Sequence, residues 1–154
     1  SLSSTDDHTI FAQPEGVKQF WTKADIISDW NRTAGNFNEG VGEGYDMQAG
    51  CTLEKEITVT EDCKYLNIQV RMFNGQDTNN PHLALKVGDS YVIVVGTNDN
   101  YANIQIRDDG RVYTYDLSAY VGQTITVTLV QEQAEVNHCV LQFISLQGQD
   151  IHNN

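Results

Sequence analysis

From about residue 52 onward, apolar residues tend to occupy every second position of the chain. The alternation is clearest in Thr124–Leu129, where Ile125, Val127 and Leu129 alternate with three threonines. Successive side chains of a β-strand point to opposite faces, so this period of two predicts half-buried strands. Threonine favours an extended backbone and exposes little apolar surface, so we expect the threonines on the solvent side. The same alternation occurs in Leu53–Val59, Leu66–Met72, Leu83–Val87 and Ile104–Ile106.

Two further segments carry apolar residues at both odd and even positions. They are Tyr91–Val95 ("YVIVV") and Cys139–Ile144 ("CVLQFI"), and their composition favours central strands covered on both faces, with short buried helices as the alternative. Polar turn signals separate all of these segments, and no amphipathic helix lies between them. The pattern predicts an all-β fold, an antiparallel β-sandwich or barrel of about eight strands.

The 154 residues are enough for one domain with its own core, and we expect a single β-sandwich over residues 1–154. Residues 51–147 hold the main strands, residues 148–154 form a tail, and residues 1–50 lack a clean period. In this N-terminal part we predict a short strand near Thr9–Ala12, a helical turn around Lys23–Ser28 and then a long loop. Long loops in compact domains are usually functional or flexible.

The net charge and the cysteine content reduce the range of possible functions. The formal net charge is −12, which argues against nucleic-acid partners because these need a clustered cationic face. No apolar run reaches the roughly 20 residues of a membrane span, so we expect no membrane insertion. The three cysteines cannot all pair, and their spacing matches no zinc motif. We expect them to be small buried hydrophobic residues.

The phrase Asp116-Leu117-Ser118, followed by Tyr120 and Gly122, is the most recognisable piece of a wider pattern. Together with the strand segments, it resembles the galactose-binding-like jelly rolls, which include many carbohydrate-binding modules of bacterial polysaccharide-degrading enzymes. The resemblance implies a jelly-roll sandwich that is secreted or attached to the cell surface and tethered to other domains, with a sugar bound by end loops. A structural calcium ion is a further expectation from the resemblance, although no segment here matches a calcium-binding motif. The resemblance covers five segments: Leu53–Val59, Tyr65–Arg71, Leu83–Gly88, Tyr115–Val127 and Val140–Leu146.

Candidate ligand-binding residues follow from the resemblance and from sugar chemistry. The loop before the last strand often supplies an asparagine in this family, which implies a role for Asn137. Aromatic rings stack on the apolar side of a sugar, while amides and guanidinium groups bind its hydroxyls. A tryptophan in such a domain is also commonly part of the core. The predicted binding residues are Trp30, Tyr45, Asn100, Tyr101, Arg107 and Asn137.

A second surface is an alternative location for the ligand. Tyr65, Asn67, Gln69 and Arg71 share the outward side of one predicted strand, so this sheet face offers a polar groove to a glycan chain. Solvent-facing strands without a ligand have the same composition, because antiparallel sheets commonly leave one face wet.

Motifs for catalysis are missing from the sequence. The four histidines are scattered, with no H-E-x-x-H zinc motif and no G-x-S-x-G nucleophile elbow. We therefore predict a non-catalytic protein that binds a poly- or oligosaccharide. The alternatives are a spacer or protein-interaction module without a sugar ligand, and a small polysaccharide-active enzyme with two carboxylates across a cleft.

Overall fold

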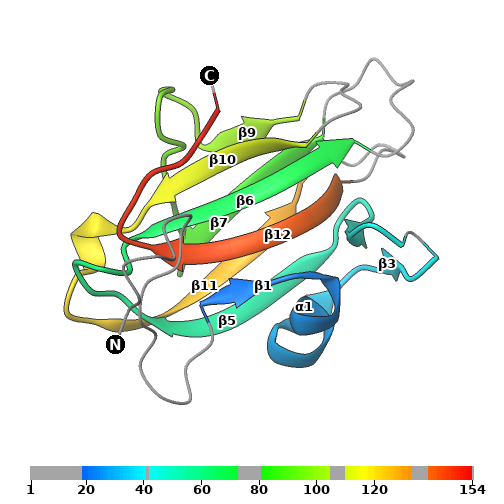
Figure 1. Cartoon of the computed structure of the whole chain (residues 1–154), viewed down its shortest axis with the longest axis horizontal. Helices are drawn as coiled ribbons and strands as arrows, with labels where there is room; N and C mark the ends of the chain where they lie inside the picture. Colours follow the sequence, from blue (N-terminus) through cyan, green and yellow to red (C-terminus); the bar gives the residue numbers. More distant parts are fainter. Residues whose placement is uncertain (1–18, 41, 73–80, 105–109, 133–138, 154) are drawn as a thin grey trace, which may run out of the picture.

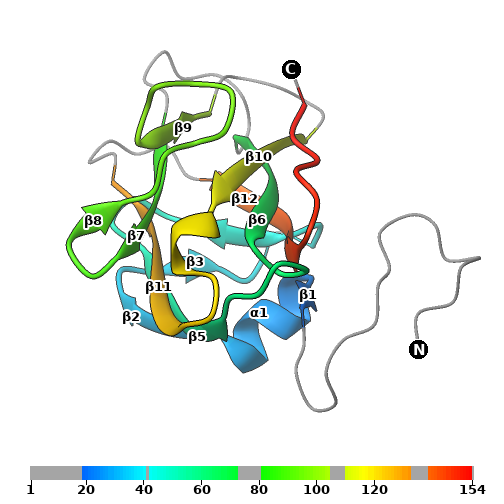
Figure 2. The ribbon, with the colours of Figure 1, turned by 90° about the vertical axis from the view of Figure 1, so that its left-hand side faces the viewer.

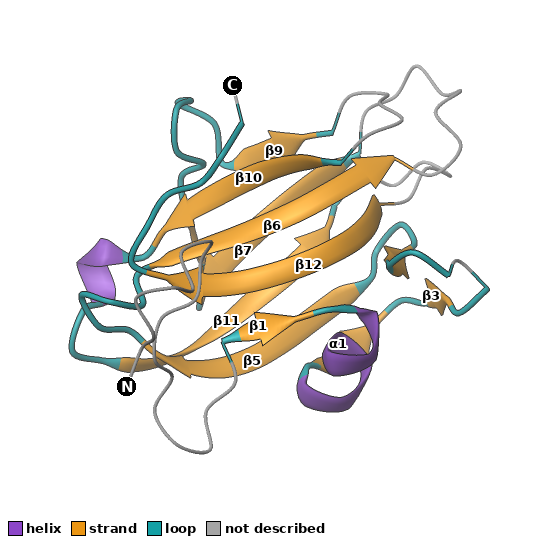
Figure 3. Cartoon of the chain, in the orientation of Figure 1, coloured by secondary structure: helices purple, strands orange, loops and turns teal. Residues whose placement is uncertain are grey.

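Two antiparallel β-sheets packed face to face form the protein (Figures 1 and 3). The computed structural model describes residues 19–40, 42–72, 81–104, 110–132 and 139–153. Sheet A has the strand order β10-β6-β12-β4-β3, and β1 also pairs with β12. Sheet B has the order β2-β5-β11-β7-β8, and β9 also pairs with β7. The predicted antiparallel sandwich is confirmed, while its galactose-binding-like subtype stays a prediction.

The twelve strands that the structure describes exceed the eight expected, because six of them have only two to four residues. Sheet A contains β1 (Phe20–Trp21), β3 (Phe37–Asn38), β4 (Tyr45–Met47), β6 (Tyr65–Met72), β10 (Arg111–Asp116) and β12 (Cys139–Gln147). Sheet B contains β2 (Asn31–Ala34), β5 (Thr52–Thr58), β7 (His82–Val87), β8 (Ser90–Tyr91), β9 (Tyr101–Asn103) and β11 (Thr124–Gln131).

The alternating pattern places the core between the two sheets. In β11, Val127 and Leu129 are buried while Thr124 and Thr126 are exposed, as predicted. β12 is a central strand, with β6 on one side and both β4 and β1 on the other. Side chains on both faces of this strand are buried, among them Cys139, Val140 and Leu141, which confirms the central, covered strand predicted for Cys139–Ile144.

The prediction of a central strand at Tyr91–Val95 is wrong. β8 ends at Tyr91, and Ile93 is 47% exposed. The segment instead crosses from one sheet to the other: the Val92 N–H donates to the Leu85 carbonyl in β7, and the Val95 N–H donates to the Thr114 carbonyl in β10. Its apolar residues are needed because Val92 and Val94 close an open side of the sandwich, where both are buried.

The turn after β10 explains the Asp116-Leu117-Ser118 phrase. The Asp116 carboxylate accepts hydrogen bonds from the Ser118 N–H (2.8 Å) and from the Ser118 hydroxyl. This local bonding starts a short 3₁₀-helix, η1 (Ser118–Tyr120), while the side chain of Leu117 is fully buried. Gly122 then takes a positive φ of 90° before β11 begins. The phrase therefore has a structural role in this chain.

The N-terminal part contains helix α1 (Lys23–Asp29), which confirms the helical turn expected around Lys23–Ser28. The Asp25 carboxylate accepts a hydrogen bond from the Thr22 N–H at 3.1 Å, which stabilises the first turn. Ile26 is the buried residue of the helix and packs into the core. No helix among the described residues has the length and apolar composition to cross a membrane. The strand expected at Thr9–Ala12 lies outside the described residues.

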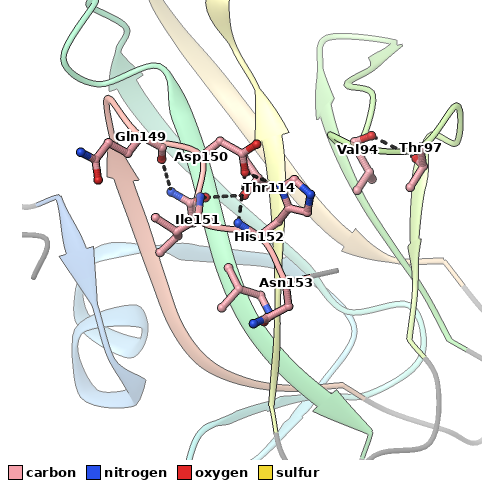
Figure 4. Close-up of polar contacts among 10 residues, drawn as sticks. Val94, Thr97, Thr114, Gln149, Asp150, Ile151, His152 and Asn153 are labelled. Carbon is pink, nitrogen blue, oxygen red and sulfur yellow. Dashed lines mark hydrogen bonds and ion pairs between the residues drawn. The ribbon is translucent and has the colours of Figure 1, made fainter.

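Residues 148–153, which we call the C-terminal strap, lie along β6 and β10 (Figures 1 and 4). The fully buried Asn67 of β6 holds the strap, because its amide N–H donates to the Gln149 carbonyl (3.0 Å) and its amide oxygen accepts from the Ile151 N–H (3.2 Å). The Thr114 hydroxyl donates to the same amide oxygen. Asn67 is therefore not available to a glycan, which corrects the proposed groove at this position.

The strap also has contacts of its own at its end. The Asp150 carboxylate accepts a hydrogen bond from the His152 N–H (3.1 Å) and lies 2.6 Å from His152 Nδ1. Burial opposes ionisation of Asp150, but its hydrogen bonds with His152 lower the pKa of this carboxyl below its usual value. The Asn153 N–H donates to the Val112 carbonyl (3.0 Å), so the strap also pairs with β10.

The three cysteines are free thiols and all are buried, as expected. Burial raises the pKa of Cys51 to about 11 and also raises the pKa values of Cys63 and Cys139. We expect all three thiols to resist a disulfide reagent such as Ellman's reagent in the folded protein and to react quickly in denaturant. Stoichiometric labelling of the native protein within minutes at pH 8 would contradict this expectation.

Candidate functional site

Two predicted binding residues lie in the core. Trp30 is 4% exposed and packs edge-on against Trp21, with ring centroids 5.6 Å apart. Tyr45 is 1% exposed and stacks on Phe37 at 4.4 Å. Neither ring has a face free for a sugar, which corrects the expectation for both residues. Both residues belong to the N-terminal part of the chain, where they were expected to be exposed on a loop. Their buried rings instead anchor this part of the chain to the sandwich.

The other four predicted residues divide into two pairs. Asn100 directly precedes β9, Tyr101 is the first residue of that strand, and both are half-buried. Arg107 and Asn137 lie outside the described residues, so their roles stay predictions. The two described strands that precede these segments, β9 and β11, both end beside the start of β7. Asn103 of β9 pairs with His82, and Gln131 of β11 pairs with Leu83.

Tyr101 belongs to a cluster that we call the outer aromatic patch, on the solvent side of sheet B. Every member is half-buried, so each combines fixed packing with some exposure to solvent. The members come from β7, from the short strands β8 and β9 beside it (Figure 2), and from the residue that follows β11. They are His82, Lys86, Tyr91, Tyr101 and Glu132.

The pleat of β7 explains why these side chains meet. Leu83 and Leu85 point into the core, so the alternate residues His82, Ala84 and Lys86 point outward. Tyr101 lies directly opposite Ala84, and Tyr91 lies directly opposite Lys86, so both tyrosines share this outer face. The small side chain of Ala84 leaves room at the centre of the patch for aromatic rings to approach the sheet.

The three rings of the patch are in contact but do not share a plane. The His82 and Tyr101 ring centroids are 4.8 Å apart, with the rings tilted by 33°. The Tyr91 and Tyr101 centroids are 5.6 Å apart, with the rings at 61°. The Lys86 ammonium lies over the Tyr91 ring, 5.0 Å from its centroid. The patch therefore offers apolar ring surface beside charged groups.

Hydrogen bonds fix the tyrosine hydroxyls. The Tyr91 hydroxyl lies 3.0 and 2.8 Å from the two carboxylate oxygens of Glu132, to which it donates. A hydrogen bond with Tyr101, followed by the bond to Glu132, raises the pKa of the Tyr91 hydroxyl. Tyr91 is therefore a neutral hydrogen-bonding group at physiological pH, and its ring is held in one orientation.

The loop that precedes Tyr101 is ordered by its own contacts. The Thr97 hydroxyl donates to the Val94 carbonyl (3.0 Å) and accepts from the Asp99 N–H (3.0 Å) (Figure 4 shows the first of these bonds). Gly96 has a φ of 85°, and a Cβ at this position would lie 3.1 Å from Nε2 of His152. The C-terminal strap therefore packs against the loop that positions Tyr101.

Most members of the patch were not predicted from the sequence. The alternation in Leu83–Val87 was a usable signal, since it places His82 and Lys86 on the outward side of the strand. Tyr91 was missed because it begins the apolar run "YVIVV", which suggested a covered strand. Glu132 follows a strand with no distinctive spacing, and its approach to Tyr91 depends on the pairing of β11 with β7.

The described residues do not form a metal site. Within those ranges, no three or more histidine, cysteine, aspartate or glutamate side chains come together in a group suited to a metal ion. Calcium needs six to eight oxygen ligands, usually including several carboxylates. The donor groups of the described residues do not meet this requirement.

Comparisons with known proteins add a distant structural likeness. No protein-family model matches the sequence, and no curated protein matches it. One similar solved structure is described as a new low affinity xylan binding module, CBM86, from the xylanolytic gut symbiont Roseburia intestinalis. It is 14% identical to this chain, with a TM-score of 0.45, over 86% of this chain and 96% of that chain. A likeness this distant does not extend that protein's ligand to this chain.

Proposed function

We propose that this protein binds a neutral carbohydrate at the outer aromatic patch without altering it, as a tethered module of a larger secreted or cell-surface protein. The observation that carries the proposal is the contact between two half-exposed tyrosines, Tyr91 and Tyr101, whose hydroxyls are fixed by Glu132 and by each other. The assignment of Tyr101 follows from the sequence, whereas Tyr91 and Glu132 come from the fold.

The chemistry of the patch suits a sugar. The C–H side of a pyranose packs on an aromatic face, and its hydroxyls need donors and acceptors held nearby. Tyr101 and His82 supply ring surface, the Glu132 carboxylate accepts hydrogen bonds, and the Lys86 ammonium donates them. The formal net charge of −12 repels polyanions, so a neutral glycan is favoured over an acidic one.

At the outer aromatic patch, Glu132 has no second carboxylate of the described strands close enough for hydrolysis. A glycosidase with the usual mechanism needs two carboxyl groups about 5–10 Å apart. On the described strands, the outer face of sheet B carries Glu54 and Glu56 in addition to Glu132. Glu54 lies opposite Thr128, and Glu132 is four residues further along the chain, which is about 13 Å of extended strand. Glu56 lies further away still.

The test is affinity electrophoresis through gels that contain neutral polysaccharides, namely xylan, galactan, mannan and mixed-linkage glucan, followed by calorimetry on any that retard the protein. We expect retardation by at least one polysaccharide and a loss of affinity of about tenfold or more in Tyr101→Ala, because a buried aromatic contact typically contributes more than about 1.4 kcal/mol.

The matched control is Tyr65→Ala. Tyr65 is a half-buried tyrosine on the outer side of β6 in the opposite sheet, and it belongs to the alternative groove. We expect its loss to leave binding unchanged. Equal affinity in wild type and Tyr101→Ala, with a loss in Tyr65→Ala, would move the site to sheet A. Absence of retardation by every polysaccharide would favour a spacer module, and release of sugar products would indicate an enzyme.

A further inference from the structure

The loop that precedes Tyr101 has little burial of its own. Residues 96–99 are all exposed, so apolar packing contributes little to holding the loop in place. The loop closes through the Val94 N–H, which donates to the Asp99 carbonyl at 3.1 Å, two residues before Tyr101. β9 has only three residues, and Tyr101 is the first of them. The position of Tyr101 therefore depends on the loop as well as on the pairing of β9 with β7.

The His152 ring of the C-terminal strap packs against this loop. A Cβ at Gly96 would lie 3.1 Å from Nε2 of His152 and 3.7 Å from both Cδ2 and Cε1, so this edge of the ring lies on the Gly96 backbone. The His152 side chain is 21% exposed, so most of the ring is covered. In Figure 4 the ring lies on the side of the strap that faces Val94 and Thr97, whereas the Ile151 side chain points away from them.

The strap holds the His152 ring in place. Nδ1 of the ring lies 2.6 Å from the Asp150 carboxylate, which also accepts a hydrogen bond from the His152 N–H. The backbone on either side of the ring is fixed to sheet A, because the Ile151 N–H donates to Asn67 and the Asn153 N–H donates to a carbonyl of β10. The ring is therefore a fixed surface against which the exposed loop rests.

We infer that His152 is a positioning residue for the outer aromatic patch: its ring supports the turn at Gly96, and this support sets the place of Tyr101. The position of Tyr101 is measurable without a ligand, whereas the effect of His152 on sugar affinity rests on the proposed function. Coupling between two sites is reciprocal, so a glycan that fixes Tyr101 also stabilises the docked strap.

The first experiment is fluorine NMR of the full chain with 3-fluorotyrosine incorporated at position 101. His152→Asn keeps a donor for the Asp150 carboxylate but removes the part of the ring that reaches Gly96. The matched control is Ile151→Ala, which shortens the neighbouring side chain of the same strap. We expect the fluorine signal to shift or broaden in His152→Asn and to stay unchanged in Ile151→Ala.

Hydrogen exchange accompanies this measurement. We expect the Asn153 amide to keep its protection in both variants, because the backbone hydrogen bonds of the strap are retained. The change of the Tyr101 signal then reports the lost contact with Gly96 rather than release of the strap. An unchanged signal in His152→Asn, or an equal change in Ile151→Ala, would overturn the inference.

The second experiment measures affinity in the xylan, galactan, mannan and mixed-linkage glucan gels. We expect His152→Asn to weaken binding by about fivefold or more, the usual size of a coupling between two sites, and Ile151→Ala to leave it unchanged. A changed Tyr101 signal with wild-type affinity would overturn the role of His152 in binding. Absence of binding by the wild type to every polysaccharide would overturn the proposed function, while the fluorine signal would still decide whether His152 positions Tyr101.

Discussion

Replacement of Trp30 by alanine is expected to lower the free energy of unfolding by about 3–5 kcal/mol, the usual loss when a buried tryptophan is truncated. The ring is 4% exposed and packs edge-on against Trp21. The residue also ends helix α1, because its N–H donates to the Ile26 carbonyl at 3.0 Å. Alanine keeps this backbone bond but leaves a cavity between the helix and the sheets.

Urea denaturation followed by circular dichroism measures this loss, and Trp30→Phe is the matched control. Phenylalanine keeps an aromatic contact with Trp21, so we expect it to cost clearly less than alanine does. The prediction also distinguishes a core residue from a ligand-binding residue. Trp30→Ala should lower the free energy of unfolding without lowering the sugar affinity of the folded fraction. Tyr101→Ala should lower the sugar affinity with little effect on the free energy of unfolding. A stable Trp30→Ala protein with lost sugar binding would restore Trp30 as a ligand-binding residue.

Replacement of Asn67 by alanine is expected to release the C-terminal strap and lower the free energy of unfolding by about 2–4 kcal/mol. The change removes the partners of the Gln149 carbonyl, the Ile151 N–H and the Thr114 hydroxyl. A buried polar group left without a partner typically costs about 1–3 kcal/mol, although strap groups that reach water recover part of this loss.

Amide hydrogen exchange distinguishes strap release from general destabilisation. We expect the Ile151 and Asn153 amides to exchange much faster in Asn67→Ala, while the amides in the centre of β11 keep most of their protection. Gln69→Ala is the control, since Gln69 is a half-buried neighbour on the same face of β6. Unchanged protection of Ile151 in Asn67→Ala would show that Asn67 does not hold the strap.

The sequence was sufficient to predict most of the fold because several of the long strands have one face exposed to solvent. In β6 and β11 the buried side chains alternate with outward ones, so a period of two identified them. Tyr91–Val95 defeated the same reasoning because its apolar residues seal the gap between the sheets rather than fill a central strand. The apolar composition of a segment indicates that its side chains are buried, but it does not indicate which element of the fold buries them.

The candidate site was less predictable, for a related reason. Tyr101 was identified because polar residues surround it in the sequence, whereas Trp30 and Tyr45 looked equally suitable yet lie in the core. The patch itself depends on pairing between distant strands, since Tyr91 and Glu132 are 41 residues apart and meet across β7. Contacts at this separation depend on strand register, which a single sequence does not specify.

The strap has a consequence for self-association. Among the described strands, β10 is the last one at one side of sheet A, and its "VYTY" sequence has the β-branched and aromatic residues that favour intermolecular strand pairing. The Val112 carbonyl and N–H are already bonded to Asn153, and the Thr114 carbonyl is bonded to Val95. These backbone groups of β10 are therefore not available to pair with a strand of a second copy of the protein. By occupying the groups of Val112, the end of the strap disfavours edge-to-edge association of sandwiches into fibres.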